Sequence, residues 1–227
     1  MNKLMAVCLL TAFCAVVSGQ DYDVLKTWNG SDGGNPYGTV LVDGGKIYGM
    51  TGTRATVGMG TVFSMDLSGS NYTILHSFAT PYSATDGALP QGDLLLAGDT
   101  LYGMTMYGGA NHPVTGSGVV FRVDIDGSDF TLLHTFGGNA ADGSYPYGSL
   151  SLIDGNLYGM TSGGGLSNAG TLFQMDTNGG NFSLLRSFAG SAGGSEPYGD
   201  LLSLGDRLYG MTSTGGSNNN GTLFSIG

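Results

Sequence analysis

The stretch that decides the fold is Tyr158-Gly159-Met160-Thr161, followed by Gly170-Thr171-Leu172-Phe173. Tyr-Gly-Met-Thr occurs four times in the chain, beginning at Tyr48, Tyr102, Tyr158 and Tyr209. Each copy is preceded by Pro-x-Gly, whose Pro stands at 36, 90, 146 and 197. Each is followed by Gly-x-x-Phe, whose Gly stands at 60, 118, 170 and 221. Self-similarity of this kind indicates a repeat architecture.

Each repeat has the pattern of four short strands. In the first repeat the expected strands are residues 39–43, 46–52, 60–65 and 72–78, separated by Gly, Asn, Asp and Ser. The first and second strands are joined by Asp43-Gly44-Gly45, where glycine supplies the positive φ that a tight hairpin needs. Four antiparallel strands in about 50 residues is the size of one propeller blade. The sequence therefore predicts an all-β fold, a four-bladed β-propeller.

The two ends of the chain complement each other. The fourth repeat ends after its third strand, and residues 22–28 align position for position with the fourth strand at residues 72–78. We expect this N-terminal strand to pair with the last blade and close the ring, which removes an open sheet edge. The predicted domain is residues 20–227, with repeats at about 36–79, 90–137, 146–189, and 197–227 plus 21–28. Two chains joined in one eight-bladed ring are the alternative to the expected monomer.

Residues 1–19 have the layout of a secretory signal peptide. Lys3 is followed by an apolar run from Leu4 to Val17 and by the small residues Ser18 and Gly19. Both cysteines, Cys8 and Cys14, lie within this segment, so no disulfide is expected after it. The predicted location is extracellular, or periplasmic, with no membrane insertion of the mature chain.

The charge of the chain limits its partners. The formal net charge is −10, from 7 Lys and Arg against 17 Asp and Glu. Nucleic acids and anionic membranes are bound through basic patches, so neither is an expected partner.

Length variation is confined to two kinds of connection. The spacing from the Pro-x-Gly centre to the following Tyr is always 11 residues, whereas the Tyr-to-Gly segment after it varies as 12, 16, 12 and 12. The connection between repeats also varies, from 9 to 13 residues. In an up-and-down blade both variable connections emerge on the same face, here called the loop face. Binding usually resides in such loops, and the two longest are residues 79–91 and 106–118.

The repeat unit of the chain resembles that of a known family. Leu157-Tyr-Gly-Met-Thr-Ser-Gly-Gly-Gly165, followed by Gly170-Thr-Leu-Phe-Gln-Met-Asp176, is similar to the GloVer tandem repeats of secreted bacterial proteins, and more distantly to kelch blades. The resemblance implies an extracellular or cell-surface repeat protein. No kelch catalytic residue is matched, so it implies no kelch-type activity.

The candidate ligand-binding residues lie in the two expanded loops. They are Tyr82, Asp86, Tyr107, Asn111 and His112, with the tyrosines expected to stack on a ligand and the others to supply polar contacts. The sequence predicts no catalytic residue, no metal site and no cofactor.

Two columns of the repeat contain possible ion-binding side chains, and both are expected to be structural. Thr39, Asp93, Ser149 and Asp200 open the innermost strands, where oxygen atoms could converge on an ion; a wet channel mouth explains them better. Lys26, His76, His134 and Arg186 share a position on the outermost strands and are expected to face solvent.

The leading hypothesis is a secreted binding or surface-interaction module for a saccharide or a cell-surface polymer. A polysaccharide-active enzyme, a lyase or hydrolase using Asp86, Asp142 or His112, is the alternative from another class. A purely structural envelope component is the third hypothesis.

Overall fold

The computed structural model describes residues 21–53, 59–78, 85–110, 117–137 and 142–227. The predicted signal peptide at residues 1–19 lies outside this part of the chain. Within it, no helix is long and apolar enough to cross a membrane.

Four antiparallel sheets follow one another along the chain. The first sheet contains β1 (Leu41–Asp43), β2 (Lys46–Thr51), β3 (Thr61–Asp66) and β4 (Thr73–Ser77). The second contains β6 (Leu95–Ala97), β7 (Thr100–Thr105), β9 (Val119–Asp124) and β10 (Thr131–Thr135). The third contains β12 (Ser151–Ile153), β13 (Asn156–Thr161), β15 (Thr171–Asp176) and β16 (Ser183–Ser187). The fourth has three strands, β17 (Leu202–Leu204), β18 (Arg207–Thr212) and β19 (Thr222–Ile226).

The repeated Gly of Tyr-Gly-Met-Thr makes room for an aromatic ring. In the first sheet Gly49 lies opposite Phe63, and a Cβ on Gly49 would lie 2.7 Å from Phe63 Cζ. The same contact recurs at Gly103, Gly159 and Gly210, at 2.5–2.6 Å from the corresponding Phe. The sequence pattern therefore couples the second strand of each sheet to the third.

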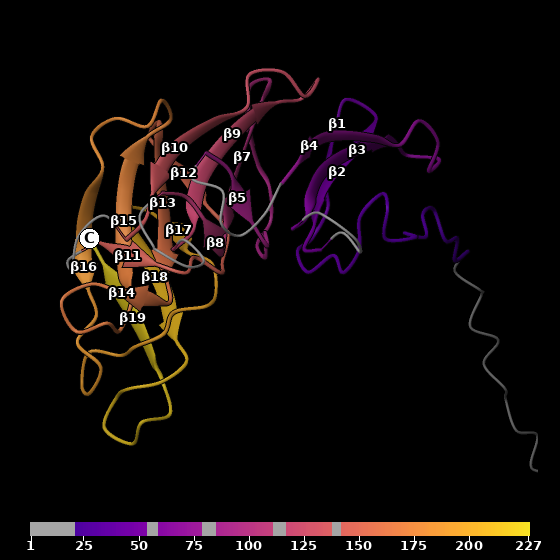
Figure 1. Ribbon diagram of the computed structural model, residues 1–227. Helices are drawn as coiled ribbons and strands as arrows, with labels where there is room; N and C mark the ends of the chain where they lie inside the picture. Colours follow the sequence, from indigo (N-terminus) through magenta and orange to yellow (C-terminus); the bar gives the residue numbers. More distant parts are fainter. Residues whose placement is uncertain (1–20, 54–58, 79–84, 111–116, 138–141) are drawn as a thin grey trace, which may run out of the picture.

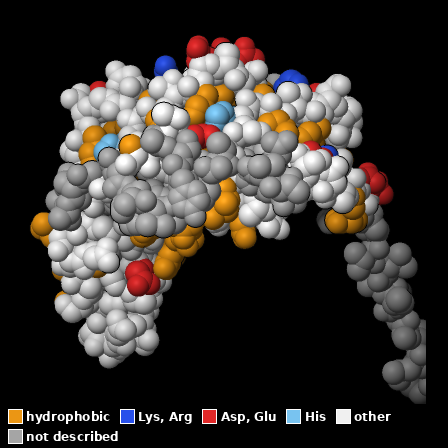
Figure 2. Space-filling model, viewed as in Figure 1, with side chains coloured by type: hydrophobic (Ala, Val, Ile, Leu, Met, Phe, Trp, Pro, Cys, Tyr) orange, Lys and Arg blue, Asp and Glu red, His pale blue; other side chains and the backbone are white. Residues whose placement is uncertain are grey.

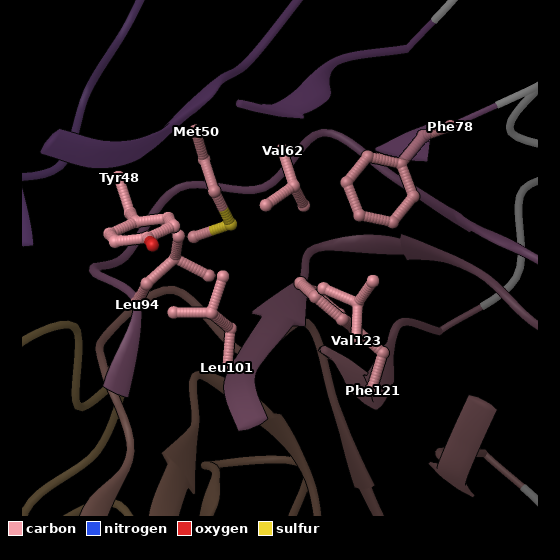
Figure 3. Close-up of a cluster of buried hydrophobic side chains, with 8 residues drawn as sticks. All are labelled: Tyr48, Met50, Val62, Phe78, Leu94, Leu101, Phe121 and Val123. Carbon is pink, nitrogen blue, oxygen red and sulfur yellow. The ribbon is translucent and has the colours of Figure 1, made fainter. Parts of the chain in front are cut away.

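Neighbouring sheets pack face to face through apolar side chains. Figure 3 shows the first junction. Its buried residues are Tyr48, Met50, Val62 and Phe78 from the first sheet and Leu94, Leu101, Phe121 and Val123 from the second. A second cluster of the same kind joins the second and third sheets, and a third joins the third and fourth. The core is thus a series of similar inter-sheet layers.

The sheets are arranged in an arc, with the first and fourth at opposite ends (Figure 1). The last face of the arc is uncovered: Met211 and Leu223 are 64% and 75% exposed, whereas their equivalents Met50 and Val62 are 7% and 0% exposed. The predicted closure is not seen. Residues 21–29 form no strand, and they lie along the first sheet instead of β19 (Figure 1).

Contacts of the N-terminal segment explain this position. Trp28 packs on Phe63, and the Lys26 ammonium lies 4.4 Å from the centre of the Tyr72 ring. Lys26 also forms an ion pair with Asp32. The two ring contacts join the segment to the first sheet, whereas the ion pair with Asp32 lies within the N-terminal segment itself.

Candidate functional site

On the loop face, the two variable connections pair with each other. β5 (Gly87–Ala88) pairs with β8 (Tyr107–Gly108), which joins the connection between repeats to the long connection after β7. β11 (Gly143–Ser144) and β14 (Gly163–Gly164) form the same ladder in the next repeat. Single bridges, Gly34–Thr53 and Ser195–Thr214, occupy the equivalent positions at the two ends. These ladders were not predicted, although the common face of the two connections was.

The residue before each Pro has an unusual backbone conformation. The φ angle lies between 51° and 57° at Asn35, Leu89, Tyr145 and Glu196. Residues other than Gly, Asn and Asp rarely adopt this backbone conformation. In three repeats the conformation directs the N–H group to a carbonyl of the preceding sheet, at Met59, Ser117 and Ala169, over 2.7–2.9 Å. It therefore positions the Pro-x-Gly segments against one another.

At the inner strands of the sheets, the Gly of Pro-x-Gly lets the backbones of neighbouring repeats approach each other closely. A Cβ on Gly38 would lie 2.4 Å from the Gly92 carbonyl oxygen, and Gly92 and Gly148 stand in the same relation to the next repeat, at 2.3 Å. The next residue continues the pattern: Thr39 N–H donates to Asp93 Oδ1, 2.5 Å away, and Asp93 N–H donates to Ser149 Oγ, 2.9 Å away. Ser149 N–H then donates to Asp200 Oδ1, 2.6 Å away.

These hydrogen bonds give a structural role to the column of possible ion ligands. The side chains of Asp93, Ser149 and Asp200 each accept from the backbone of the preceding repeat, so they join neighbouring sheets. Among the residues that the structure describes, no cluster of three or more His, Cys, Asp or Glu has a composition suited to a metal ion.

Near these hydrogen bonds, four tyrosines from three repeats form two edge-on pairs. Tyr107 packs edge-on against Tyr145, with centroids 5.7 Å apart, and Tyr147 packs edge-on against Tyr198 at 4.9 Å. Burial, and then the neighbouring Tyr107 and Tyr198, raise the pKa of Tyr147 above its ordinary value. Burial and the Glu196 carboxylate do the same for the pKa of Tyr198. We call Tyr107, Tyr145, Tyr147 and Tyr198 the tyrosine cluster.

Sequence analysis identified one member of this cluster, Tyr107. Tyr147 and Tyr198, together with Tyr37, are the central residues of Pro-x-Gly, a column in which only the second repeat has Gln91. The sequence does not show that tyrosines in this column stay exposed. In the structure Tyr37 and Tyr198 are 60% and 44% exposed, although each follows the repeated proline.

The other predicted ligand contacts are distributed differently. Tyr82, Asn111 and His112 lie outside the described residues. Asp86 is 8% exposed; its carboxylate is 3.0 Å from His76 Nε2 and accepts from the Gly87 N–H. Asp142 repeats the arrangement with His134, 3.4 Å away, and the Gly143 N–H. Both carboxylates named for the enzymatic alternative thus lie in a repeated His–Asp arrangement.

The expectation that the basic column faces solvent is wrong for three of its four members, whereas the fourth, Arg186, is exposed. The side chains of Lys26, His76 and His134 are each only 19% exposed. The His76 ring stacks on Phe130 with centroids 3.5 Å apart, and the His134 ring stacks on Phe182 at 3.7 Å. A strand at the outer rim is covered by the first aromatic residue of the equivalent strand in the next sheet, and the order of residues within one repeat does not show this.

A model of the family described as Gloeobacter/Verrucomicrobia repeat matches residues 11–224. No curated protein matches the chain. Among solved structures, TolB from Acinetobacter baumannii is similar with a TM-score of 0.50 and 15% identity, covering 90% of this chain and 42% of that one.

Two further matches extend the comparison. A Mycobacterium tuberculosis puromycin-hydrolyzing peptidase has a TM-score of 0.52 and 12% identity, over 86% of this chain and 27% of that one. A chain of the nidogen/laminin complex has a TM-score of 0.48 and 14% identity, over 80% of this chain and 59% of that one. This chain thus spans less than two thirds of each. The likeness to TolB is to a β-propeller protein and concerns the fold alone.

Proposed function

Because the chain belongs to the Gloeobacter/Verrucomicrobia repeat family, we propose that its repeats form a secreted β-propeller module that binds a saccharide through the loop face. The observation that carries the proposal is the tyrosine cluster. Its two ring pairs join the second repeat to the third and the third to the fourth, and Tyr198 keeps 44% of its surface exposed. A rigid scaffold that presents exposed rings beside variable loops is the usual setting of a binding site.

The chemistry of the cluster suits a sugar. A tyrosine ring covers the apolar face of a pyranose, and its hydroxyl can exchange hydrogen bonds with sugar hydroxyls. Figure 2 shows hydrophobic side chains gathered along the concave edge of the arc. The nearest charged group among the described contacts of the cluster is a carboxylate, Glu196 Oε2, 3.4 Å from Tyr198 Oη. We therefore expect neutral saccharides to bind better than anionic ones.

Ring closure is part of the same proposal. In a closed four-bladed ring, residues 22–28 would pair with β19, and Gly199 and Asp200 would meet Gly38 and Thr39 as the other repeats meet one another. Support comes from Gly199, whose Cβ position has no atom within 4 Å, whereas those of Gly38, Gly92 and Gly148 are filled. Closure would bring Tyr37 beside Tyr198 and complete an aromatic rim.

A glycan array on the purified protein is the test, followed by titration of any ligand found. Tyr147→Ala and Tyr107→Ala should each weaken binding by roughly 1–3 kcal/mol, the usual cost of removing an aromatic anchor. Asn71→Gly and Asn181→Gly are the matched controls. Both are exposed hairpin residues with φ of 52–53°, which glycine retains, and they lie on the opposite face.

Three results would contradict the proposal. The first is an array without a ligand. The second is binding that the hairpin variants weaken and the tyrosine variants do not. The third is turnover of the same glycans, which would favour the enzymatic alternative.

A further inference from the structure

The open edge of the fourth sheet lies in a groove. Among the described residues β19 pairs only with β18, whereas β3, β9 and β15 each have an outer partner. Two cavities flank β19. One, of about 460 Å³, is lined by Arg186, Phe188 and residues 222–226. The other, of about 370 Å³, is lined by Leu185, Arg207, Leu208 and Ile226, among others. Apolar side chains and unpaired backbone groups thus border the same space.

The three outer strands that are present show what such a groove accepts. An aromatic residue stands immediately before each of these strands (Tyr72, Phe130 or Phe182), and it stacks under a basic side chain of the preceding repeat. Their last aromatic residue packs edge-on against the third-strand Phe of the next sheet, as Phe78 does on Phe121, 5.3 Å away. An occupant therefore needs an aromatic residue at each end, six positions apart.

Arg186 is the basic residue whose aromatic partner would lie in this groove. It aligns with Lys26, His76 and His134, and no described aromatic ring lies on it. Leu223 lines the larger cavity and is 75% exposed, whereas its equivalents Val62, Val120 and Leu172 are 0% exposed because they pack in the clusters between successive sheets. The groove thus lacks one aromatic ring and one paired strand.

We propose that the groove beside β19 is a β-strand-binding site, and that its occupant is Tyr22–Trp28 of the same chain. Tyr22 and Trp28 have the required spacing, and Tyr22, Val24 and Leu25 are 87%, 65% and 41% exposed where they now lie. Tyr22 would stack on Arg186. The inference rests on the ring closure proposed above, and it adds the side-chain contacts and the register by which the segment would be held.

The register follows from the first sheet. There Ser64 lies opposite Thr73 and Thr61 opposite Ser77. The equivalent pairs are Ser225 with Asp23 and Thr222 with Thr27. Trp28 keeps its contact with Phe63 in this arrangement, because a closing aromatic packs against the sheet that follows its own. One segment then joins the fourth sheet by hydrogen bonds and the first by packing, which is recognition by strand addition.

An engineered disulfide in the full chain tests the register. With Cys8→Ser and Cys14→Ser as background, Asp23→Cys and Ser225→Cys should form an intrachain bond under mild oxidation, detected by mass spectrometry, in a protein of one-chain mass. Cross-strand neighbours bring Cβ atoms within disulfide reach. Ser64→Cys with Thr73→Cys is the positive control, and Asp23→Cys with Ser203→Cys, on the inner strand β17, is the negative control.

Each other outcome overturns the proposal. Failure of the Asp23–Ser225 pair to form while the positive control forms would show that the segment does not reach β19. Disulfide-linked dimers would show that a second copy supplies the strand. Saccharide binding does not enter the measurement, so failure here is distinct from failure on the array.

Discussion

Trp28 lies against Phe63 with ring centroids 5.8 Å apart and planes at 63°, almost the geometry in which Phe78 lies against Phe121 at 5.3 Å and 68°. Phe136 on Phe173 and Phe188 on Phe224 continue the series. The N-terminal segment thus occupies, on the first sheet, the position that the outer strand of a preceding sheet holds on every other one. This is the relation that a closed ring requires.

Removal of this ring should destabilise the first sheet. Trp28→Ala leaves Phe63 partly uncovered, and we expect a loss of about 2 kcal/mol in the free energy of unfolding, less than for a fully buried tryptophan because Trp28 is half-buried. Trp28→Phe should retain most of it. Chemical denaturation measures both. Equal stability of Trp28→Ala and the parent protein would show that the packing contributes nothing.

The His–Asp pairs give a second prediction. Asp142→Ala removes the partner of His134 and the acceptor of the Gly143 N–H, and should cost about 1–3 kcal/mol of stability. Binding of a ligand found on the array should be unchanged after correction for unfolding. A specific loss of binding or turnover in a stably folded Asp142→Ala protein would give this carboxylate the functional role that the enzymatic alternative assigns to it.

Gly193 offers the reverse experiment. It aligns with Asp32, Asp86 and Asp142, and a Cβ placed there would lie 3.5 Å from Arg186 Nη2 in ordinary contact. Gly193→Asp should therefore restore the ion pair that the fourth repeat lacks and stabilise the fold by up to about 1 kcal/mol. Gly193→Asn is the uncharged control. A lower melting temperature for Gly193→Asp than for Gly193→Asn would contradict the assignment.

The Lys26–Asp32 pair predicts a pH dependence. The Asp32 carboxylate accepts hydrogen bonds from the Lys26 ammonium and, with a smaller effect, from the Asn29 N–H. These bonds hold the pKa of Asp32 below its ordinary value of 3.8. A lowered carboxyl pKa contributes stability above the unfolded value and loses it as the pH falls through the folded value. Trp28 is the only tryptophan, so its fluorescence should report release of the segment in acid. Asp32→Asn should remove that acid transition; an identical profile in both proteins would refute it.

Local pattern predicted much of the fold. The expected strand at residues 46–52 is β2 at Lys46–Thr51, and the expected strand at 72–78 is β4 at Thr73–Ser77, because hairpin glycines and apolar alternation fix both ends. The family assignment is confirmed over residues 11–224. What alternation could not show is which sheet the N-terminal segment contacts, since that depends on the relative placement of whole sheets.

The candidate site was harder to predict for the same reason. Tyr147 and Tyr198 are 51 residues apart and meet because the glycines beside them let neighbouring repeats approach. His76 appeared solvent-facing in sequence because its cover, Phe130, belongs to the next repeat. Asp86 was expected to contact a ligand, a prediction that no observation yet tests, and its neighbours show a structural use for its carboxylate.

The most direct test of the central claim, a ring closed within one chain, compares two glycines. In Gly148→Ala the new Cβ would lie 2.3 Å from the Gly199 carbonyl oxygen, and this overpacking should cost about 1–3 kcal/mol. In the open arc Gly199 has no atom within 4 Å of its Cβ position, so Gly199→Ala should be neutral there. A closed ring places Gly38 against it. We predict that Gly199→Ala lowers the melting temperature as much as Gly148→Ala does, in a protein of one-chain mass; an unchanged melting temperature, or a two-chain mass, would contradict closure.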